Sequence, residues 1–256
     1  MKTIAVTSGK GGVGKTSLAA NLGVTLADMG YRATVFDADL ALANIEVVLG
    51  TRAEFSLQDV VAEEKTLSEV VKKGPGGVGF IAGGSGVPIL MRSGPVRLGL
   101  FFDQVKALEN STDVLFFDTA AGLDNRVMSF VKFADEVLLV TTPEPASVTD
   151  AYATIKTIFR QKPDATVNIV VNMVDNETEA IEVFEVLRRI TNDFVKKDVW
   201  YSGFVRRDDN VGLCARKRKP FALAEPETVA KTDTSNLACL IAKDIKLPLT
   251  NGSKAA

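Results

Sequence analysis

Short apolar runs alternate with longer segments of helical periodicity along this chain. Seven runs have the length of a β-strand, and most are continuous stretches of Val, Ile, Leu and Phe rather than alternating ones. They cover residues 3–7, 33–37, 78–82, 114–118, 136–141, 167–172 and 199–205. Continuous apolar strands are typical of a parallel sheet that is buried on both faces.

Segments with helical patterning separate these strands. They cover residues 16–29, 96–108, 125–133, 148–159, 177–194 and 227–245. Alternating β and α segments predict an α/β fold with a doubly wound, mostly parallel sheet of about seven to eight strands flanked by helices. Gly30 is a candidate C-cap for the first helix, and Ser56 with Asp59 is an N-cap signal for a further short helix.

The chain shows no internal repeat and no linker rich in Ser or Pro. We therefore expect a single domain over residues 1–256, with a flexible tail at about residues 250–256. Met1 and Lys2 lead directly into the first apolar run, so no signal peptide is expected. No run approaches the roughly 18 apolar residues of a membrane span. These features predict a cytoplasmic protein.

The 256-residue sequence contains no histidine and only two cysteines. The lack of histidine excludes Ser-His-Asp and Cys-His nucleophile systems and histidine metal sites. Cys214 and Cys239 do not form a C-x-x-C pair, so neither a disulfide framework nor an all-cysteine zinc site is expected. We expect both to be buried small hydrophobes. The net charge of −2 gives no global reason to expect nucleic acid or an acidic membrane as a partner.

The segment after the first strand carries the strongest chemical motif. Residues 9–16 read Gly-Lys-Gly-Gly-Val-Gly-Lys-Thr, which matches G-x-x-x-x-G-K-[ST] between a predicted strand and a predicted helix. In such a P-loop, backbone N–H groups surround the phosphates of ATP or ADP, the lysine reaches the β- and γ-phosphates, and the hydroxyl binds Mg²⁺. The predicted phosphate-binding residues are Gly11, Gly12, Val13, Gly14, Lys15, Thr16 and Ser17. A glycine-rich turn without a ligand is the alternative.

Carboxylates follow two predicted strands at the edge where ligands collect in parallel α/β sheets. Asp118 closes an apolar strand in the form of a Walker B site, so it is predicted to hold Mg²⁺ through water; a strand cap is the alternative. Asp39 is predicted to orient the attacking water beside the metal. Asp37 is either a partner of the metal and P-loop or a purely structural residue. The N–H of Gly122 lies where a switch loop could approach the γ-phosphate.

The form K-G-G-V-G-K-T, with its extra Lys10, resembles the deviant Walker A motif of the MinD/ParA family of P-loop ATPases. This resemblance implies an ATP-dependent homodimer in which Lys10 reaches across to the partner's ATP. Residues 37–50 look like the MinD-type switch I segment, in which Asp39 matches the family's catalytic aspartate. Residues 141–152, Thr-Thr-Pro-Glu-Pro-Ala-Ser-Val-Thr-Asp-Ala-Tyr, are most similar to the FlhG (FleN) branch of flagellar-number regulators.

The resemblance also assigns residues around the base and the dimer interface. It implies that Glu144, in the Pro-Glu-Pro loop, contacts the partner's nucleotide. Asn172 ends a predicted strand, at the position where the family's asparagine pairs with adenine. The alternative is an asparagine that only forms a turn after the strand. A second base loop is expected after the last strand, at Arg206 and Asp208, although the proline common in relatives is absent here.

With the P-loop, the resemblance implies a slow, Mg²⁺-dependent and dimer-dependent ATPase that regulates flagellar number or placement through a protein partner of the flagellar or division machinery. A MinD-like division-site regulator and a ParA-like DNA or cargo partition ATPase are the alternatives. An iron–sulfur carrier and an ATP sensor without turnover are rivals from other classes.

Two features bear on contacts with DNA or the membrane. A basic cluster is either a solvated surface or a contact for DNA or anionic lipid; it comprises Arg206, Arg207, Arg216, Lys217, Arg218 and Lys219. The last predicted helix carries Leu237, Leu240, Ile241 and Ile245 on one face, which favours packing on the core. Peripheral attachment at the inner face of the membrane is the alternative for this helix.

Overall fold

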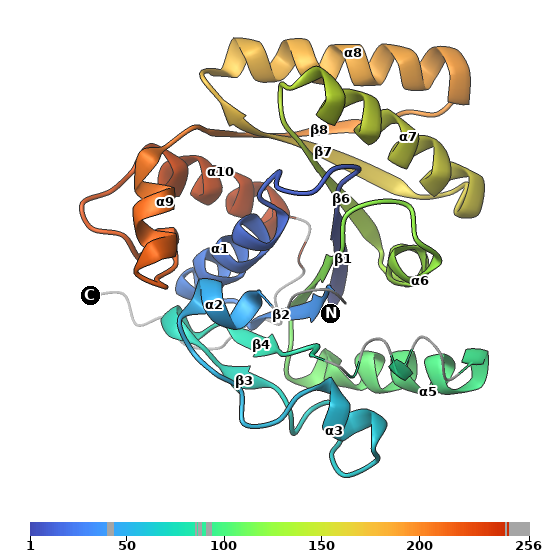
Figure 1. Cartoon of the computed structure of the whole chain (residues 1–256), viewed down its shortest axis with the longest axis vertical. Coiled ribbons are helices and arrows are strands. Elements are labelled where there is room, and N and C mark those ends of the chain that lie inside the picture. Colours follow the sequence, from blue (N-terminus) through green and yellow to red (C-terminus); the bar gives the residue numbers. More distant parts are fainter. Residues whose placement is uncertain (40–43, 85, 87–88, 91–93, 244, 246–256) are drawn as a thin grey trace.

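A twisted eight-stranded sheet runs through the centre of the molecule (Figure 1). The computed structural model describes residues 1–39, 44–84, 86, 89–90, 94–243 and 245. The strand order is β3-β4-β2-β5-β1-β6-β7-β8, and neighbouring strands are parallel except for β3 and β4. Both the predicted α/β class and the doubly wound, mostly parallel sheet are confirmed.

All seven predicted strands are present, with ends shifted by at most two residues. They are β1 (Lys2–Thr7), β2 (Ala33–Ala38), β4 (Gly79–Ile81), β5 (Val114–Thr119), β6 (Glu136–Thr141), β7 (Thr166–Val174) and β8 (Trp200–Arg206). The strand that was not predicted is β3 (Lys72–Lys73), an antiparallel edge pairing of two exposed lysines. Such a pair carries no apolar signal, so patterning could not reveal it.

The predicted helices are present as well. They are α1 (Lys15–Asp28), α5 (Gly94–Ala107), α6 (Asn125–Phe133), α7 (Pro145–Gln161), α8 (Glu177–Val195) and α10 (Val229–Lys243). α7 begins earlier than its apolar pattern because Pro145 occupies the first turn, where a proline needs no N–H donor.

The described part of the fold also contains three short α-helices, α2 (Ile45–Leu49), α3 (Leu57–Val61) and α9 (Asp209–Arg216), and three 3-10 helices, η1 (Pro75–Gly77), η2 (Leu108–Asn110) and η3 (Phe221–Leu223). The predicted N-cap signal is confirmed at α3, because Ser56 accepts from the Gln58 N–H while the Asp59 carboxylate accepts from the Ser56 N–H. The C-cap of α1 is Met29 rather than the predicted Gly30, which is the next residue and ends the helix with a left-handed φ of +92°. Helices α2 and α9 were not predicted.

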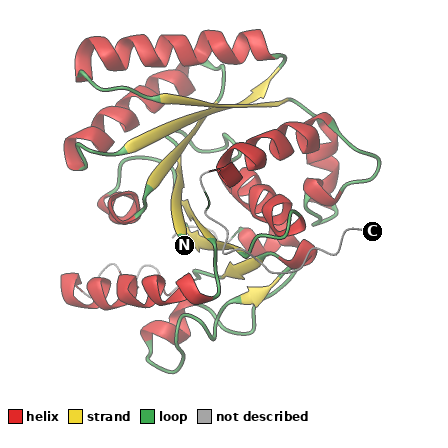
Figure 2. Ribbon diagram, turned by 180° about the vertical axis from the view of Figure 1, so that it is seen from behind, coloured by secondary structure: helices red, strands yellow, loops and turns green. Residues whose placement is uncertain are grey.

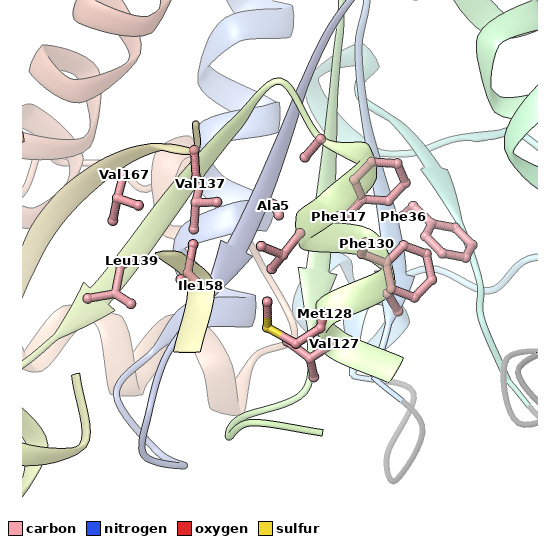
Figure 3. Packing of buried hydrophobic residues seen from close by; sticks show 14 of the residues in the cluster. Ala5, Phe36, Phe117, Val127, Met128, Phe130, Val137, Leu139, Ile158 and Val167 are labelled. Atoms are coloured by element: carbon pink, nitrogen blue, oxygen red, sulfur yellow. The ribbon is translucent and has the colours of Figure 1, made fainter. Parts of the chain in front are cut away.

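The helices cover both faces of the sheet (Figure 2). On one face, α1, α2 and α10 pack on strand residues such as Val6, Val35 and Leu138. On the other, α3, α5, α6, α7 and α8 pack on the alternate strand positions. There Phe130 of α6 meets Phe117 of β5 at a ring-centroid distance of 5.3 Å and Phe36 of β2 at 5.7 Å (Figure 3). Burial on both faces explains why the strands are continuous apolar runs.

One expectation about the C-terminal third is wrong: Cys239 is exposed and Cys214 is half-buried, so neither is a fully buried hydrophobe. The predicted packing of the last helix on the core is confirmed for Leu237, Ile241 and Ile245, whereas Leu240 is 45% exposed. The predicted flexible tail at 250–256 lies outside the described residues. In the described part of the chain, no helix is both long enough and apolar enough to cross a membrane.

Candidate nucleotide-binding site

The loop between β1 and α1 has the backbone that a phosphate cradle requires. Gly12 and Gly14 have φ angles of +80° and +89°, in the left-handed region that favours glycine. A side chain at Gly14 would also lie 2.4 Å from the amide nitrogen of Asn172, whereas the space beside Gly11 and Gly12 is open. The backbone at Gly11 and Gly12 is therefore accessible to a ligand, whereas Gly14 packs against Asn172 of β7.

Lys15 is the first residue of α1 and is buried. Burial lowers the pKa of Lys15, and the nearby carboxylates of Asp118 and Asp39 oppose this change. Since α1 follows β1, Asp39 follows β2 and Asp118 lies near the end of β5, the sheet order brings the three side chains to one edge. The structure therefore unites the predicted phosphate-binding lysine with both predicted carboxylates.

Asp118 is fully buried, and within the described residues neither of its carboxylate oxygens has a hydrogen-bond partner. Burial raises the pKa of Asp118 to about 7. The Thr16 hydroxyl opposes that rise, but its geometry falls short of a hydrogen bond. A buried carboxylate without a partner is costly unless it is neutralised or meets a cation. Oxygen donors at this position fit Mg²⁺, so Asp118 and Thr16 are suitable residues to hold it.

Asp37 organises the segment that carries Asp39. Its two carboxylate oxygens accept hydrogen bonds from the Asp39 N–H (3.1 Å) and from the Ile45 N–H (3.2 Å) at the start of α2. Burial raises the pKa of Asp37 to about 7, although these backbone hydrogen bonds oppose the rise. Of the two interpretations left open by the sequence, these contacts favour the structural one. Residues 40–43, in the middle of the switch I match, lie outside the described residues.

The loop after β5 packs on the strand that leads into the P-loop. The Thr119 hydroxyl donates to the Val6 carbonyl (3.0 Å), and the Gly122 N–H donates to the Ser8 carbonyl (2.9 Å). Gly122 has a φ of +99°, which permits this turn. The N–H that was predicted to approach the γ-phosphate is thus engaged with the chain itself in this conformation.

A cavity of about 300 Å³ opens beside the P-loop and reaches the loop after β8. Its size is at the lower end of small-molecule pockets. Its walls, which are mostly apolar, suit a planar base. Residues that line it include Gly14, Ser17, Asn172, Met173, Arg206, Asp208, Val211 and Phe221.

The side chains predicted to contact the base also hold the pocket together. Asn172 donates from its amide nitrogen to the Val13 carbonyl (2.8 Å), which joins β7 to the P-loop. Arg206 donates from its Nε and Nη2 to Asp233 of α10 (2.8 and 2.7 Å). Asp208 caps α9 and accepts from the Ala230 N–H (3.1 Å). The structure thus places these residues at the pocket, and their contacts with adenine stay predictions.

Lys10 lies at the outer edge of the loop. Its Nζ is 2.5 Å from a Glu144 carboxylate oxygen of the same chain, and both side chains are partly exposed. The hydrogen bond from Lys10 lowers the pKa of Glu144. The two residues that the resemblance assigns to a dimer interface are therefore neighbours here, and their roles in a partner's site stay predictions.

Several pocket residues were not predicted as site residues from the sequence, among them Met173, Val211 and Phe221. Apolar residues carry no chemical motif, and Phe221 lies far from Asn172 in the chain. Met173 has a φ of +60°, a conformation that sequence patterning does not reveal for a methionine.

The glycine loop, the buried lysine and the strand-end carboxylates define a P-loop NTPase. The family model described as "ParA: NUBPL iron-transfer P-loop NTPase" matches residues 1–242, and the chain belongs to that family.

Individual relatives agree with this membership. The chain is 37% identical over 230 residues to the antiactivator FleN of Pseudomonas aeruginosa. This match covers 90% of this chain and 82% of FleN. It is 33% identical over 247 residues to the flagellum site-determining protein YlxH of Helicobacter pylori, and this match covers 96% of this chain and 83% of YlxH. The structure of the septum site-determining protein MinD of Pyrococcus horikoshii complexed with Mg-ADP superposes with a TM-score of 0.78 at 26% identity, covering 94% of this chain and 96% of that one. The predicted resemblance to the MinD/ParA family and its FlhG (FleN) branch is confirmed.

Proposed function

We propose that this protein is an ATP-dependent dimerisation switch that regulates flagellar number or placement. The observation that carries the chemistry is the buried Asp118 carboxylate, which lacks a hydrogen-bond partner among the described residues and lies near Lys15. Such a site is suited to a metal-bound nucleotide. The similarity to FleN and YlxH supports the flagellar role, and the Mg-ADP complex of the MinD relative supports the ligand.

Each residue of the site has a task in the proposed reaction. Backbone N–H groups of the glycine loop and Lys15 bind the phosphates, which neutralises their charge. Thr16 and Asp118, with Asp39 nearby, would hold Mg²⁺, which supplies further charge neutralisation when bound. Asp39 orients the water that attacks the γ-phosphorus. Because phosphoryl transfer depends mainly on positioning and electrostatics, this set is sufficient without histidine.

The proposed switch uses Lys10 and Glu144. In the closed dimer, Lys10 leaves Glu144 and enters the partner's site, where a cation supplied in trans can accelerate phosphoryl transfer by about 10³–10⁵. Glu144 then faces the partner's nucleotide. Hydrolysis to ADP and phosphate separates the subunits, so the dimer and its protein partner remain together only while ATP persists.

The partner belongs to the flagellar machinery in this proposal, and the protein acts in the cytoplasm or at the inner face of the membrane. A division-site or partition role is the alternative, and the basic residues of the 216–219 turn would then be the ones to meet DNA. Counting flagella by electron microscopy in cells that lack the protein tests the choice. Altered flagellar number supports the proposal, whereas normal flagella with minicells or lost plasmids would favour the alternatives.

Measuring phosphate release from the full chain with and without Mg²⁺ tests the proposed ATP hydrolysis. Wild-type protein should release phosphate only with Mg²⁺, and Lys15→Ala should lose ATP binding. Unchanged ATP affinity in Lys15→Ala would refute the P-loop assignment. Tight ATP binding without phosphate release, even with flagellar partners present, would instead identify a nucleotide sensor.

Iron transfer is a second candidate because the family description names it. Among the described residues, no three His, Cys, Asp or Glu side chains form a metal site made by the protein alone, which an iron centre would need, whereas the proposed Mg²⁺ would be shared with the phosphates of the nucleotide. Cys214 and Cys239 lie on different helices, α9 and α10. Stoichiometric iron or a brown colour in the purified protein would favour this candidate over the switch.

A further inference from the structure

A second cavity, of about 640 Å³, lies away from the P-loop between α2 and the turn that follows α9. We call it the α2–α9 groove. It is lined by Glu46, Val47, Gly50, Thr51, Arg52, Ala53 and Arg218. Figure 1 shows α2 and α9 at the same side of the molecule, beside α1. The groove is larger than the cavity beside the P-loop, and the proposed reaction uses none of its residues.

The two walls of the groove meet in a close backbone contact. A side chain at Gly50 would lie 2.0 Å from the Arg218 carbonyl oxygen, so only glycine fits there. Gly50 also has a φ of +65°, as expected for a residue that ends a helix. This contact joins the end of α2 to the turn after α9, and both residues line the groove.

Arg218 has an unusual backbone for its residue type. Its φ is +50°, directly after α9, at a position where glycine is the common choice. A non-glycine residue in the left-handed region is disfavoured, and such outliers cluster at functional sites. Here the conformation places an arginine, rather than a bare backbone, on the wall of the groove.

The positive charges of the groove are available to a ligand. Within the described part of the chain, neither Arg52 nor Arg218 forms an ion pair. Several other exposed arginines among the described residues also lack an ion pair, so what distinguishes Arg52 and Arg218 is that both line the same groove. The acidic residue of the lining, Glu46, uses one carboxylate oxygen to accept from the Ala53 N–H (2.7 Å). Lys217 and Lys219 flank Arg218 and add to the positive potential.

We propose that the α2–α9 groove binds the phosphate group of a small phosphorylated molecule, with Arg52 and Arg218 as its recognition residues. Two guanidinium groups can each donate a fork of hydrogen bonds to phosphate oxygens, which is the strongest common mode of phosphate recognition. The volume falls within the 300–1,000 Å³ range of small-molecule pockets. The groove is open and its volume suits a compact ligand. Exposed cations at Arg216, Lys217 and Lys219 lie beside Arg218, so a DNA duplex is the competing ligand that the experiment has to exclude.

The groove is bordered by two helices that also contact the nucleotide site. α2 begins at Ile45, whose N–H is held by Asp37. α9 carries Val211 and Gly212, which line the cavity beside the P-loop. The groove lies where these two helices end. The inference goes beyond the proposed ATPase, because binding in the groove requires neither hydrolysis nor dimerisation.

The test is a titration of the full-length chain by two-dimensional amide NMR, with the P-loop filled by saturating Mg-ADP. Ribose 5-phosphate is the probe, and ribose is its matched control without the phosphate. We expect saturable shifts of the Gly50, Thr51, Arg52 and Ala53 amides with ribose 5-phosphate and none with ribose. Arg52→Gln and Arg218→Gln should each weaken binding about tenfold or more.

Arg189→Gln, at an exposed position of helix α8, is the control variant and should bind like the wild type. Since Arg52 and Arg218 are exposed, their substitution should leave the fold intact, which the rest of the spectrum reports. The proposal is overturned if no saturable shift occurs in the groove, if ribose shifts the same amides, or if both arginine variants bind normally. It is also overturned if only a DNA duplex or anionic lipid vesicles perturb these signals. Failure of ATP hydrolysis would not affect this outcome.

Discussion

The Lys10 ammonium lies 2.5 Å from the Glu144 carboxylate of the same chain, at the mouth of the nucleotide site. The contact connects the outer edge of the P-loop to the residue before α7. Ion pairs that are this exposed contribute little to stability and break readily. Lys10 can therefore exchange Glu144 for another anion at small cost, as a lysine that serves a partner's site must do.

Removal of Lys10 should separate ATP binding from dimerisation. Because its side chain is directed to Glu144 rather than into its own loop, Lys10→Ala should keep ATP affinity within about twofold of the wild type. The variant should remain monomeric with ATP on a sizing column. Lys106→Ala is the matched control, since Lys106 also forms an exposed ion pair but lies on α5. A normal ATP-induced dimer of Lys10→Ala would refute the role in trans.

Asp118→Asn should uncouple nucleotide binding from Mg²⁺. The substitution keeps the size of the side chain but removes the buried charge that has no hydrogen-bond partner among the described residues. Without nucleotide, the variant should melt no lower than the wild type, because a neutral amide is easier to bury than a lone carboxylate. Its affinity for ATP should no longer rise on addition of Mg²⁺. An intact Mg²⁺ effect by calorimetry would assign the metal to other residues.

Asp37→Ala tests the arrangement of the catalytic segment. The change removes the acceptor for the Asp39 and Ile45 N–H groups and should destabilise the protein by about 1–3 kcal/mol. We expect phosphate release to fall while ATP affinity stays near that of the wild type, since Asp37 positions Asp39 rather than the phosphates. Asp59→Ala removes a comparable backbone contact at α3 and should leave phosphate release unchanged. Equal loss of activity in both variants would mean that Asp37 acts only through overall stability.

The Asp113 carboxylate should make the free energy of unfolding depend on pH. It is buried and accepts from the Arg32 backbone N–H, Nε and Nη2, and the hydrogen bond from the Arg32 side chain holds the pKa of Asp113 below its ordinary value. In the unfolded chain the pKa of Asp113 is about 4, and in the folded protein it is lower. The ionised carboxylate therefore stabilises the fold above about pH 4, and this stability is lost as the pH falls through the pKa of the folded state. Asp113→Asn should therefore cost about 1–3 kcal/mol at pH 7 and progressively less below about pH 4. Urea unfolding from pH 8 to pH 3 measures this, and a difference that stays constant to pH 3 would contradict it.

The sequence was sufficient for the sheet and the P-loop because both signals are local. The strands were continuous apolar runs, and the loop motif occupies residues 9–16. Helix α2, with five residues, was missed because so short an element shows little periodicity. α9, with eight residues, was missed for the same reason.

The contacts that shape the site could not be predicted from the sequence. Lys10 and Glu144 are 134 positions apart, and Asn172 and Val13 are 159 apart. Such pairs depend on the order of strands in the sheet, which apolar patterning does not determine. The buried state of Asp118 was also beyond the sequence, because an aspartate at a strand end is often an exposed cap.

In the proposed cycle, ATP closes two copies of this chain into a dimer, and only hydrolysis by way of Asp39 reopens it. The mass of Asp39→Ala in the analytical ultracentrifuge with Mg-ATP tests this cycle most directly. We expect a stable species of about twice the 27.4 kDa chain mass with Mg-ATP, a monomer without nucleotide, and a monomer when Lys10→Ala is added. A 27.4 kDa species that binds ATP yet stays monomeric would refute the dimerisation switch.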